Sequence, residues 1–181
     1  MEIPSTFSVS DSISFEDAIE LTQSLLAEVE RHHVPEPELE RIITALVQSE
    51  NGARGFFVTY LTDDRDLADH PSTAVIHALQ SSPQIVTELL VKNLAMSTAM
   101  ILTHLQNQHP DMAKGSERVQ QRTKQLVQMI QIPEITSRLQ QLQASVETGH
   151  GEYESFLNRW KYSSEQRQAI AQQVQEVLDR L

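Results

Sequence analysis

One long, mainly apolar segment near the middle of the chain constrains the fold more than any other feature. Ser82-Pro83 is a helix-start signal, a capping residue followed by proline at the first helical position. The pattern that follows predicts a single helix reaching about Gln108. Apolar residues occupy most of its circumference, and such a helix belongs in the centre of a bundle. The segment therefore predicts an all-α fold built around residues 82–108.

Helix signals recur on both sides of this segment. Ser14 with Asp17 resembles a capping box, Asn51-Gly52 is a helix-end signal, and few prolines or glycines interrupt the runs between them. The stretch 53–61 would also suit a buried strand, but the chain offers no second strand for it to pair with. Shorter helices are therefore predicted over about 14–31, 37–49, 53–61, 71–79, 110–131, 133–146, 153–160 and 163–181.

The last fifty or so residues carry two apolar seams with 4-3-4 spacing. Such seams predict two helices paired as an antiparallel hairpin, with a possible use as a homodimer contact. The glutamines between 120 and 175 are interpreted as solvated helix surface. The seam residues are Ile135, Leu139, Leu142 and Val146 in the first helix and Ile170, Val174, Val177 and Leu181 in the second.

The expected architecture is a helical bundle of about six to eight helices with a C-terminal helical hairpin. Residues 1–13 form a polar N-terminal lead-in, 14–131 the bundle core, and 132–181 the hairpin, as part of the same domain. The chain has no cysteine, and its first twenty residues lack the basic and apolar pattern of a signal peptide. Both observations favour a cytoplasmic protein. Glu88 and Lys92 interrupt the apolar stretch 85–105, which argues against membrane insertion.

The charge of the chain is unevenly distributed. The net charge is −11, residues 1–70 hold 15 acidic against 4 basic residues, and residues 71–181 hold 10 of each. An acidic front half argues against nucleic acid as a partner, because phosphate recognition needs a basic face. The acidic excess is equally consistent with a plain role in solubility.

The motifs that would identify an enzyme are missing from the sequence. The five glycines form no phosphate-binding loop, no serine lies in a nucleophile-elbow context, and the histidines do not match a metalloprotease helix. The acidic run from Asp63 to Asp69 departs from the calcium-loop pattern. We therefore expect a non-enzymatic protein with no cofactor and no metal site.

A stripe of polar residues on the central helix predicts one candidate site. Asn93, Ser97 and His104 lie close to one line, with Lys92 beside it, and Arg54 is the polar group expected to join them. Between helices they would line a pocket for a small ligand. The alternative interpretation is that the stripe faces solvent or a neighbouring polar helix.

Two further groups predict protein contact. Lys114, Arg118 and Arg122 repeat every four residues and would form a cationic ridge on one helix. The ridge would dock an acidic partner or a phosphate-bearing ligand, or pair with the acidic front half of the chain. The aromatic residues Tyr153, Phe156 and Trp160 would form an apolar patch, or seal the end of the bundle. The leading hypothesis is a protein-binding module, such as an assembly factor, adaptor or regulator, and the alternative is a bundle that binds a small ligand.

Two stretches carry a resemblance to known sequences. ENGARGFFVTYL at residues 50–61 and LVKNLAMSTAM at residues 90–100 resemble uncharacterised helical proteins of cyanobacteria and plant plastids. The similarity covers roughly residues 35–130. It implies no catalytic residues, and it implies a housekeeping or regulatory role connected with oxygenic photosynthesis.

Overall fold

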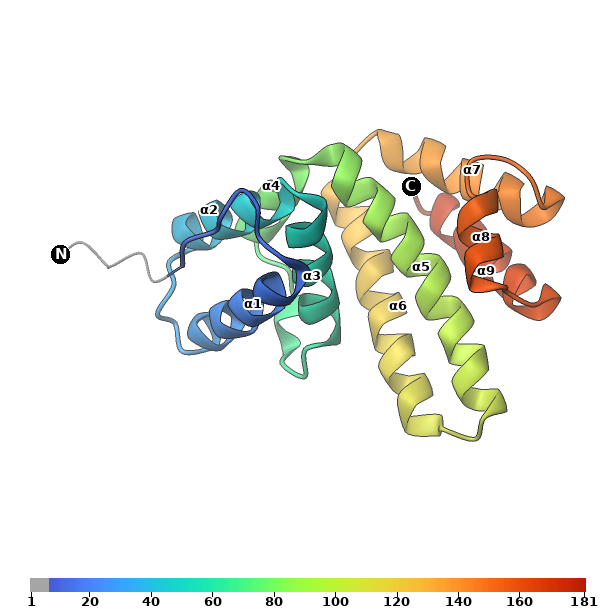
Figure 1. The fold of residues 1–181 in the computed structure, drawn as a ribbon, viewed down its shortest axis with the longest axis horizontal. Helices are drawn as coiled ribbons and strands as arrows, with labels where there is room; N and C mark the ends of the chain where they lie inside the picture. The colour runs from blue at the N-terminus through green and yellow to red at the C-terminus, as the bar shows by residue number, and fades with distance from the viewer. Residues whose placement is uncertain (1–6) are drawn as a thin grey trace. The chain divides into compact units, whose positions relative to one another are not determined.

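The structure is a computed structural model that describes residues 7–181. Over those residues it is all-α and contains no strand, which confirms the predicted fold class (Figure 1). The helices are α1 (Phe15–Glu30), α2 (Glu36–Val47), α3 (Glu50–Thr62), the 3₁₀ turn η1 (Asp66–Ala68), α4 (Thr73–Gln80), α5 (Pro83–Gln106), α6 (Pro110–Ile130), α7 (Glu134–Thr148), α8 (Glu154–Trp160) and α9 (Ser164–Leu178).

The chain divides into two compact units, and their boundary falls inside α5. The N-terminal unit ends at Leu89 and the C-terminal unit begins at Leu90. The predicted division at residues 13 and 131 stays a prediction. Each unit is described below by itself.

The N-terminal unit is built from two helix pairs, α1 with α3 and α2 with α4. The α1–α3 crossing is close because α3 presents Gly55 to α1. A Cβ atom at Gly55 would lie 2.5 Å from the Cβ of Ala18 and 2.9 Å from the carbonyl oxygen of Phe15. The missing side chain therefore allows the two helices to approach backbone to backbone, and Phe56, Phe57 and Leu61 fill the core beside the crossing.

The Asn51-Gly52 pair was expected to end the second helix, and this prediction is wrong. Both residues lie in the first turn of α3, where the hydroxyl of Ser49 accepts a hydrogen bond from the Gly52 N–H at 3.1 Å. A Cβ atom on Gly52 would also collide with the carbonyl oxygen of Leu46. Glycine is therefore required by the tight junction between α2 and α3 and not by a left-handed helix end.

Residues 1–6 of the predicted lead-in lie outside the described part of the chain. The remainder is packed against the N-terminal unit. Ile13 is buried, and the guanidinium of Arg41 on α2 donates a hydrogen bond to the carbonyl oxygen of Phe7 at 3.2 Å. The segment from Phe7 to Ile13 therefore contributes to the unit, although its composition is polar.

In the C-terminal unit, α5 and α6 run antiparallel and form a helical hairpin (Figure 1). The helices α7 and α9 pack against each other and are also antiparallel. The seam residues of α7 and α9 are buried, apart from the exposed Leu181, so the predicted hairpin is present. A homodimer through this hairpin stays a prediction and would use its outer faces.

Several glutamines join helices instead of lying on solvated surface. Gln166 donates to the hydroxyl of Thr103 at 2.9 Å and to the carbonyl of Ala99, and Gln120 donates to the hydroxyl of Thr98 at 2.8 Å. The interpretation of the glutamines as mere solvated surface is wrong at these positions. Amide side chains reach across the gaps between helices here, and each bond replaces contact with water.

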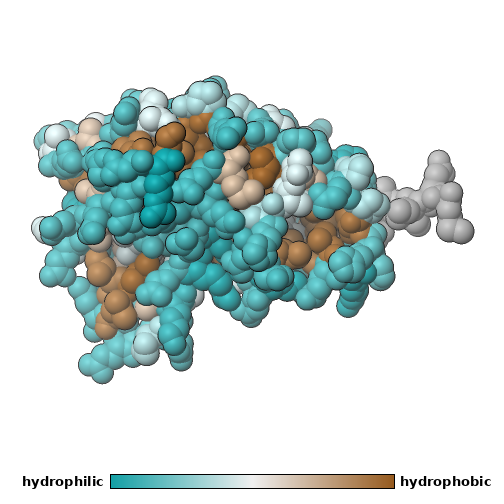
Figure 2. All heavy atoms as spheres, turned by 180° about the vertical axis from the view of Figure 1, so that it is seen from behind, coloured by the Kyte–Doolittle hydropathy of each residue, from teal (hydrophilic) through white to brown (hydrophobic). Residues whose placement is uncertain are grey.

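The expectation that α5 is shielded all round is wrong near its C-terminal end. Val86, Leu90, Val91 and Leu94 are fully buried, but Leu105 is 52% exposed. Figure 2 shows apolar side chains gathered at the free end of the α5–α6 hairpin, at its lower left. By length and composition α5 is apolar enough to cross a membrane, with a mean hydropathy of 1.5 over an 18-residue window that is half buried in protein. Core helices of soluble proteins share these properties, so they do not decide the question, and the expected absence of membrane insertion stays a prediction.

Candidate functional site

An open groove of the N-terminal unit lies where α2 and α4 begin. Its volume is about 620 Å³. Both helices present their first turns to it, because α2 packs against α4. The lining residues are Glu36, Pro37, Glu40, Pro71, Ser72, Thr73 and Ala74.

A small apolar pocket adjoins this groove. Glu36 and Ser72 line both concavities, so the groove and the pocket are neighbours that share part of a wall. The pocket has a volume of about 90 Å³. A cavity of roughly 150 Å³ holds a benzene molecule, so this pocket is of the size of one aliphatic side chain. Its walls come from five elements and consist of Leu26, Val29, Glu36, Leu39, Ile43, Tyr60, Leu67, His70, Ser72 and Val75.

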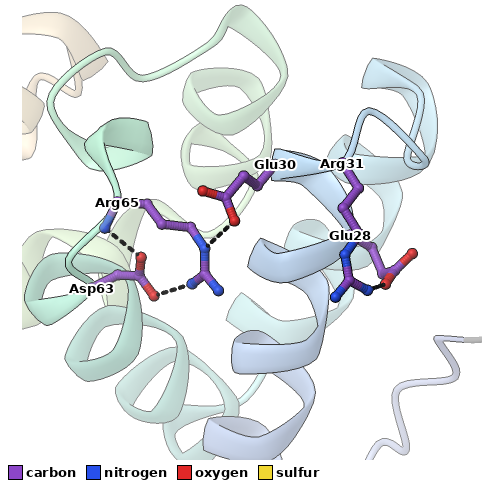
Figure 3. A network of polar contacts seen from close by, with 5 residues as sticks. All are labelled: Glu28, Glu30, Arg31, Asp63 and Arg65. Atoms are coloured by element: carbon purple, nitrogen blue, oxygen red, sulfur yellow. Dashed lines mark hydrogen bonds and ion pairs between the residues drawn. The ribbon is translucent and has the colours of Figure 1, made fainter.

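Two sets of hydrogen bonds hold the pocket wall that follows α3. The hydroxyl of Tyr60 donates to the carbonyl oxygen of Leu67 at 3.1 Å. The guanidinium of Arg65 lies between Asp63 and Glu30, at 2.7 and 2.9 Å, and so ties the same segment to the end of α1 (Figure 3). Hydrogen bonds to Glu30 and Asp63 raise the pKa of Arg65 above its ordinary value. These contacts hold the backbone at Leu67 to α3 and tie the segment after α3 to the end of α1.

The ionised groups of the groove are carboxylates. Glu36 and Glu40 are one helical turn apart on α2, and the lining contains no Lys or Arg. The imidazole of His77 on α4 lies 3.7 Å from the carboxylate of Glu40, and Glu40 is 45% exposed. The third acid of this turn, Glu38, points elsewhere and pairs with Arg41 at 2.7 Å. The groove thus combines an apolar recess with an acidic edge.

The shape of the groove and pocket limits the kind of ligand they can hold. Within residues 7–181 no group of three or more His, Cys, Asp or Glu side chains is placed to hold a metal ion. A drug-sized ligand needs a pocket of about 300–1,000 Å³ that encloses most of its surface. The enclosed part here is far smaller, and the larger part is open to solvent. The shape therefore fits an extended chain with one anchoring side chain.

The residues of the predicted polar stripe are distributed over both units. Arg54 belongs to the N-terminal unit, is exposed, and places its guanidinium 5.0 Å from the ring centre of Phe15. In the C-terminal unit the Ser97 hydroxyl donates to the carbonyl of Asn93 at 2.7 Å, and Lys92 lies over the ring of Phe156 at 5.7 Å.

The fold gives Ser97 and Lys92 partners of their own, and the proposed ligand contact of the stripe stays a prediction. Asn93 and His104 are half-buried. Ser97 is satisfied by its own helix and Lys92 by an aromatic face. Neither of the two concavities described above includes any residue of the stripe.

The predicted cationic ridge is a surface feature at one end only. Lys114 is exposed, with its amine 4.0 Å from Asp111, and Arg118 is half-buried. Arg122 is 2% exposed, so its assignment as a contact residue is wrong. The four-residue spacing does align the side chains, but the line runs from the free end of α6 into its packed part. The spacing of residues predicts on which face of a helix their side chains lie, but it does not predict how burial varies along the helix axis.

The three residues of the predicted aromatic patch differ in their exposure to solvent. Tyr153 is buried, and Phe156 is half-buried between the rings of Tyr153 and Tyr162, at 6.3 and 6.1 Å. Burial raises the pKa of Tyr162 to about 12. Trp160 is 49% exposed and is the aromatic residue of this group available for contact.

The groove residues were not predicted from the sequence. Glu36, Glu40 and His70 stand in ordinary acidic and loop contexts, and Val29 and Val75 read only as core positions of separate helices. The one local signal is the pair of helix starts, with Pro37 in the first turn of α2 and Ser72 capping α4. That signal locates two helix ends but does not bring them together.

Comparison with known proteins supplies a family and no described function. Neither curated proteins nor solved structures gave a match to the chain. The model of one family, described as uncharacterised conserved protein UCP020893, matches residues 14–177, which include every helix of the groove and most of the C-terminal unit. The chain therefore belongs to that uncharacterised conserved family.

Proposed function

We propose that this protein is a non-enzymatic protein-binding module that docks a segment of a partner chain in the α2–α4 groove. The observation that carries the proposal is an open groove that shares Glu36 and Ser72 with a side-chain-sized apolar pocket. Peptide recognition commonly combines an extended docking path with pockets for individual side chains. The wall hydrogen bonds of Tyr60 and Arg65 support the proposal, since a preorganised pocket lowers the entropy cost of binding.

The proposal includes a setting. The resemblance of residues 50–61 and 90–100 to proteins of cyanobacteria and plastids supports an assembly factor, adaptor or regulator connected with oxygenic photosynthesis. We place the protein in the cytoplasm. Trp160 and Lys114 are exposed and are proposed as secondary contacts of the C-terminal unit.

Site-specific photocrosslinking tests the docking site directly. A benzoylphenylalanine replacing Thr73, which is exposed on the groove, should form a defined adduct in an extract of the source organism. The same group at the exposed Thr62, which lines neither concavity, serves as the control position. Repeating the Thr73 experiment with Val29→Phe, which fills the pocket, should abolish the adduct.

The captured protein must then bind in isolation. Filling the pocket should weaken its affinity roughly tenfold or more, the scale of burying one aliphatic side chain. Leu67→Phe is the second filling variant, should Val29→Phe destabilise α1. Adducts that form equally from Thr62, or that persist in both filled variants with unchanged thermal stability, would overturn the proposal.

A further inference from the structure

The groove also carries information about the chemistry of its occupant. Its enclosed part is lined mainly by aliphatic side chains and measures about 90 Å³, which matches a leucine- or methionine-sized side chain. Its open part is edged by two carboxylates and by no cationic side chain. An occupant therefore meets apolar contact and negative charge within a few ångströms of each other.

The negative charge exceeds the opposing field of the helix ends. The first turns of α2 and α4 each contribute a partial positive charge of roughly half an elementary charge. Glu36 and Glu40 contribute two full negative charges, and residues 1–70 hold 15 acidic against 4 basic residues. The imidazole of His70 lines the pocket, and that of His77 lies 3.7 Å from the carboxylate of Glu40. The net potential of the groove is negative.

We propose that the groove selects a partner segment in which an aliphatic side chain enters the pocket and a Lys or Arg one or two residues away pairs with Glu36 and Glu40. This inference rests on the proposed docking function and specifies its partner. The spacing is consistent, because Glu36 edges the pocket itself and Glu40 lies about 6 Å further along α2. Residues of an extended chain two positions apart are separated by about 6–7 Å.

Short fluorescein-labelled peptides test the inference on the full chain by fluorescence polarisation. The reference peptide, here the Lys peptide, carries one Leu flanked by a Lys on each side on a Ser-Gly background. Its partners replace Leu by Ser, either Lys by Gln, or both Lys by Gln, and the last of these is the Gln peptide. We expect the Leu→Ser peptide to lose binding, and each Lys→Gln peptide to bind about threefold more weakly at low salt. Isotope-labelled protein locates the binding through amide shifts at residues 72–75.

The protein variants supply matched controls. Glu36→Gln/Glu40→Gln should weaken the reference peptide by roughly tenfold and leave the Gln peptide unaffected. Glu38→Gln removes the same kind of charge from the same helix turn, but Glu38 is engaged by Arg41, so binding should not change. His77→Gln tests whether Glu40 affects peptide affinity through its contact with the His77 imidazole. We expect this variant to bind the reference peptide with unchanged affinity.

The possible failures are distinguishable. If the Gln peptide binds as tightly as the Lys peptide, shifts residues 72–75 and is blocked by Val29→Phe, the docking function stands and the charge selection is wrong. If the peptides shift residues elsewhere, or bind both pocket-filled variants unchanged, the docking site itself is wrong. If Glu38→Gln weakens the reference peptide as much as Glu36→Gln/Glu40→Gln does, the affinity depends only on the overall charge of the unit. That result would also overturn the inference.

Discussion

The helices within the N-terminal unit and the helices within the C-terminal unit meet through different kinds of contact. In the N-terminal unit α1 and α3 meet backbone to backbone at Gly55, and aromatic and aliphatic side chains fill the space beside them. In the C-terminal unit amide side chains and a buried lysine bridge the helices. Close apolar packing fixes the distances between helices, whereas long polar side chains tolerate small changes of spacing. The groove occurs in the unit that contains the close backbone crossing.

Substitution of Gly55 should produce the largest effect. Gly55→Leu forces a bulky side chain into the α1–α3 crossing and should cost more than about 3 kcal/mol, while Gly55→Ala should cost roughly 1–2 kcal/mol after its gain in helix propensity. Hydrogen exchange of α1 and α3 peptides measures the loss within the N-terminal unit.

Gly115 provides the matched control from the other unit. It lies within α6, and a Cβ atom there would meet nothing within 4 Å. Gly115→Ala should therefore stabilise the protein by up to about 1 kcal/mol. A stabilising Gly55→Ala would show that the close crossing is not the feature that defines the N-terminal unit.

The buried lysine of the C-terminal unit should give the next largest effect. The amine of Lys124, whose side chain is 9% exposed, lies 2.8 Å from Gln173 and 3.1 Å from Glu176. Glu176→Ala leaves this cation without its carboxylate and should cost about 1–3 kcal/mol. Lys124→Met, which removes the charge itself, should cost less. Urea unfolding followed by the fluorescence of Trp160, the single tryptophan, measures both.

An exposed ion pair in the same unit serves as the reference. His150 and Glu154 approach to 3.5 Å, with side chains 81% and 42% exposed. Glu154→Ala should change stability by no more than about 0.5 kcal/mol. If Glu176→Ala costs no more than this, the polar bridge between α6 and α9 contributes nothing beyond a surface contact.

The smallest effect concerns the end of α1. Hydrogen bonds from His33 and then Arg31 hold the pKa of Glu28 below its ordinary value of 4.5. A depressed carboxyl pKa stabilises the fold above the unfolded-state pKa, and this stability is lost as the pH falls through the folded-state pKa. His33→Ala should raise the Glu28 pKa more than Arg31→Ala does, as measured by carboxyl NMR. The reverse order would show that the imidazole contact is not the dominant one.

The sequence predicted features that depend on neighbours along the chain. The Ser14 hydroxyl accepts a hydrogen bond from the Asp17 N–H, α5 begins at Pro83, and the α7 and α9 seams are buried apart from Leu181. Each depends on residues a few positions apart, whose geometry a helix fixes in advance. The all-α class followed from these local patterns.

The candidate site depends on residues that meet only after folding. Val29, Leu67 and Val75 come from three elements, and no periodicity in one element predicts that their side chains enclose a pocket. Gly55 was equally unremarkable, because the need for glycine arises from Ala18 on another helix. The predicted exposure of Arg122 was wrong for a related reason. The sequence predicted that the basic residues align on α6, but not that the second half of α6 is packed against other helices.

Because five separate elements supply the walls of the pocket, it exists only while the whole N-terminal unit is folded. Any molecule bound there is thermodynamically linked to the unfolding of that unit. A ligand present at 100 times its dissociation constant would add about 2.7 kcal/mol to the stability of the folded form. Occupancy of the groove would thereby set how much of this protein survives heat or proteolysis, so that its abundance follows that of its partner.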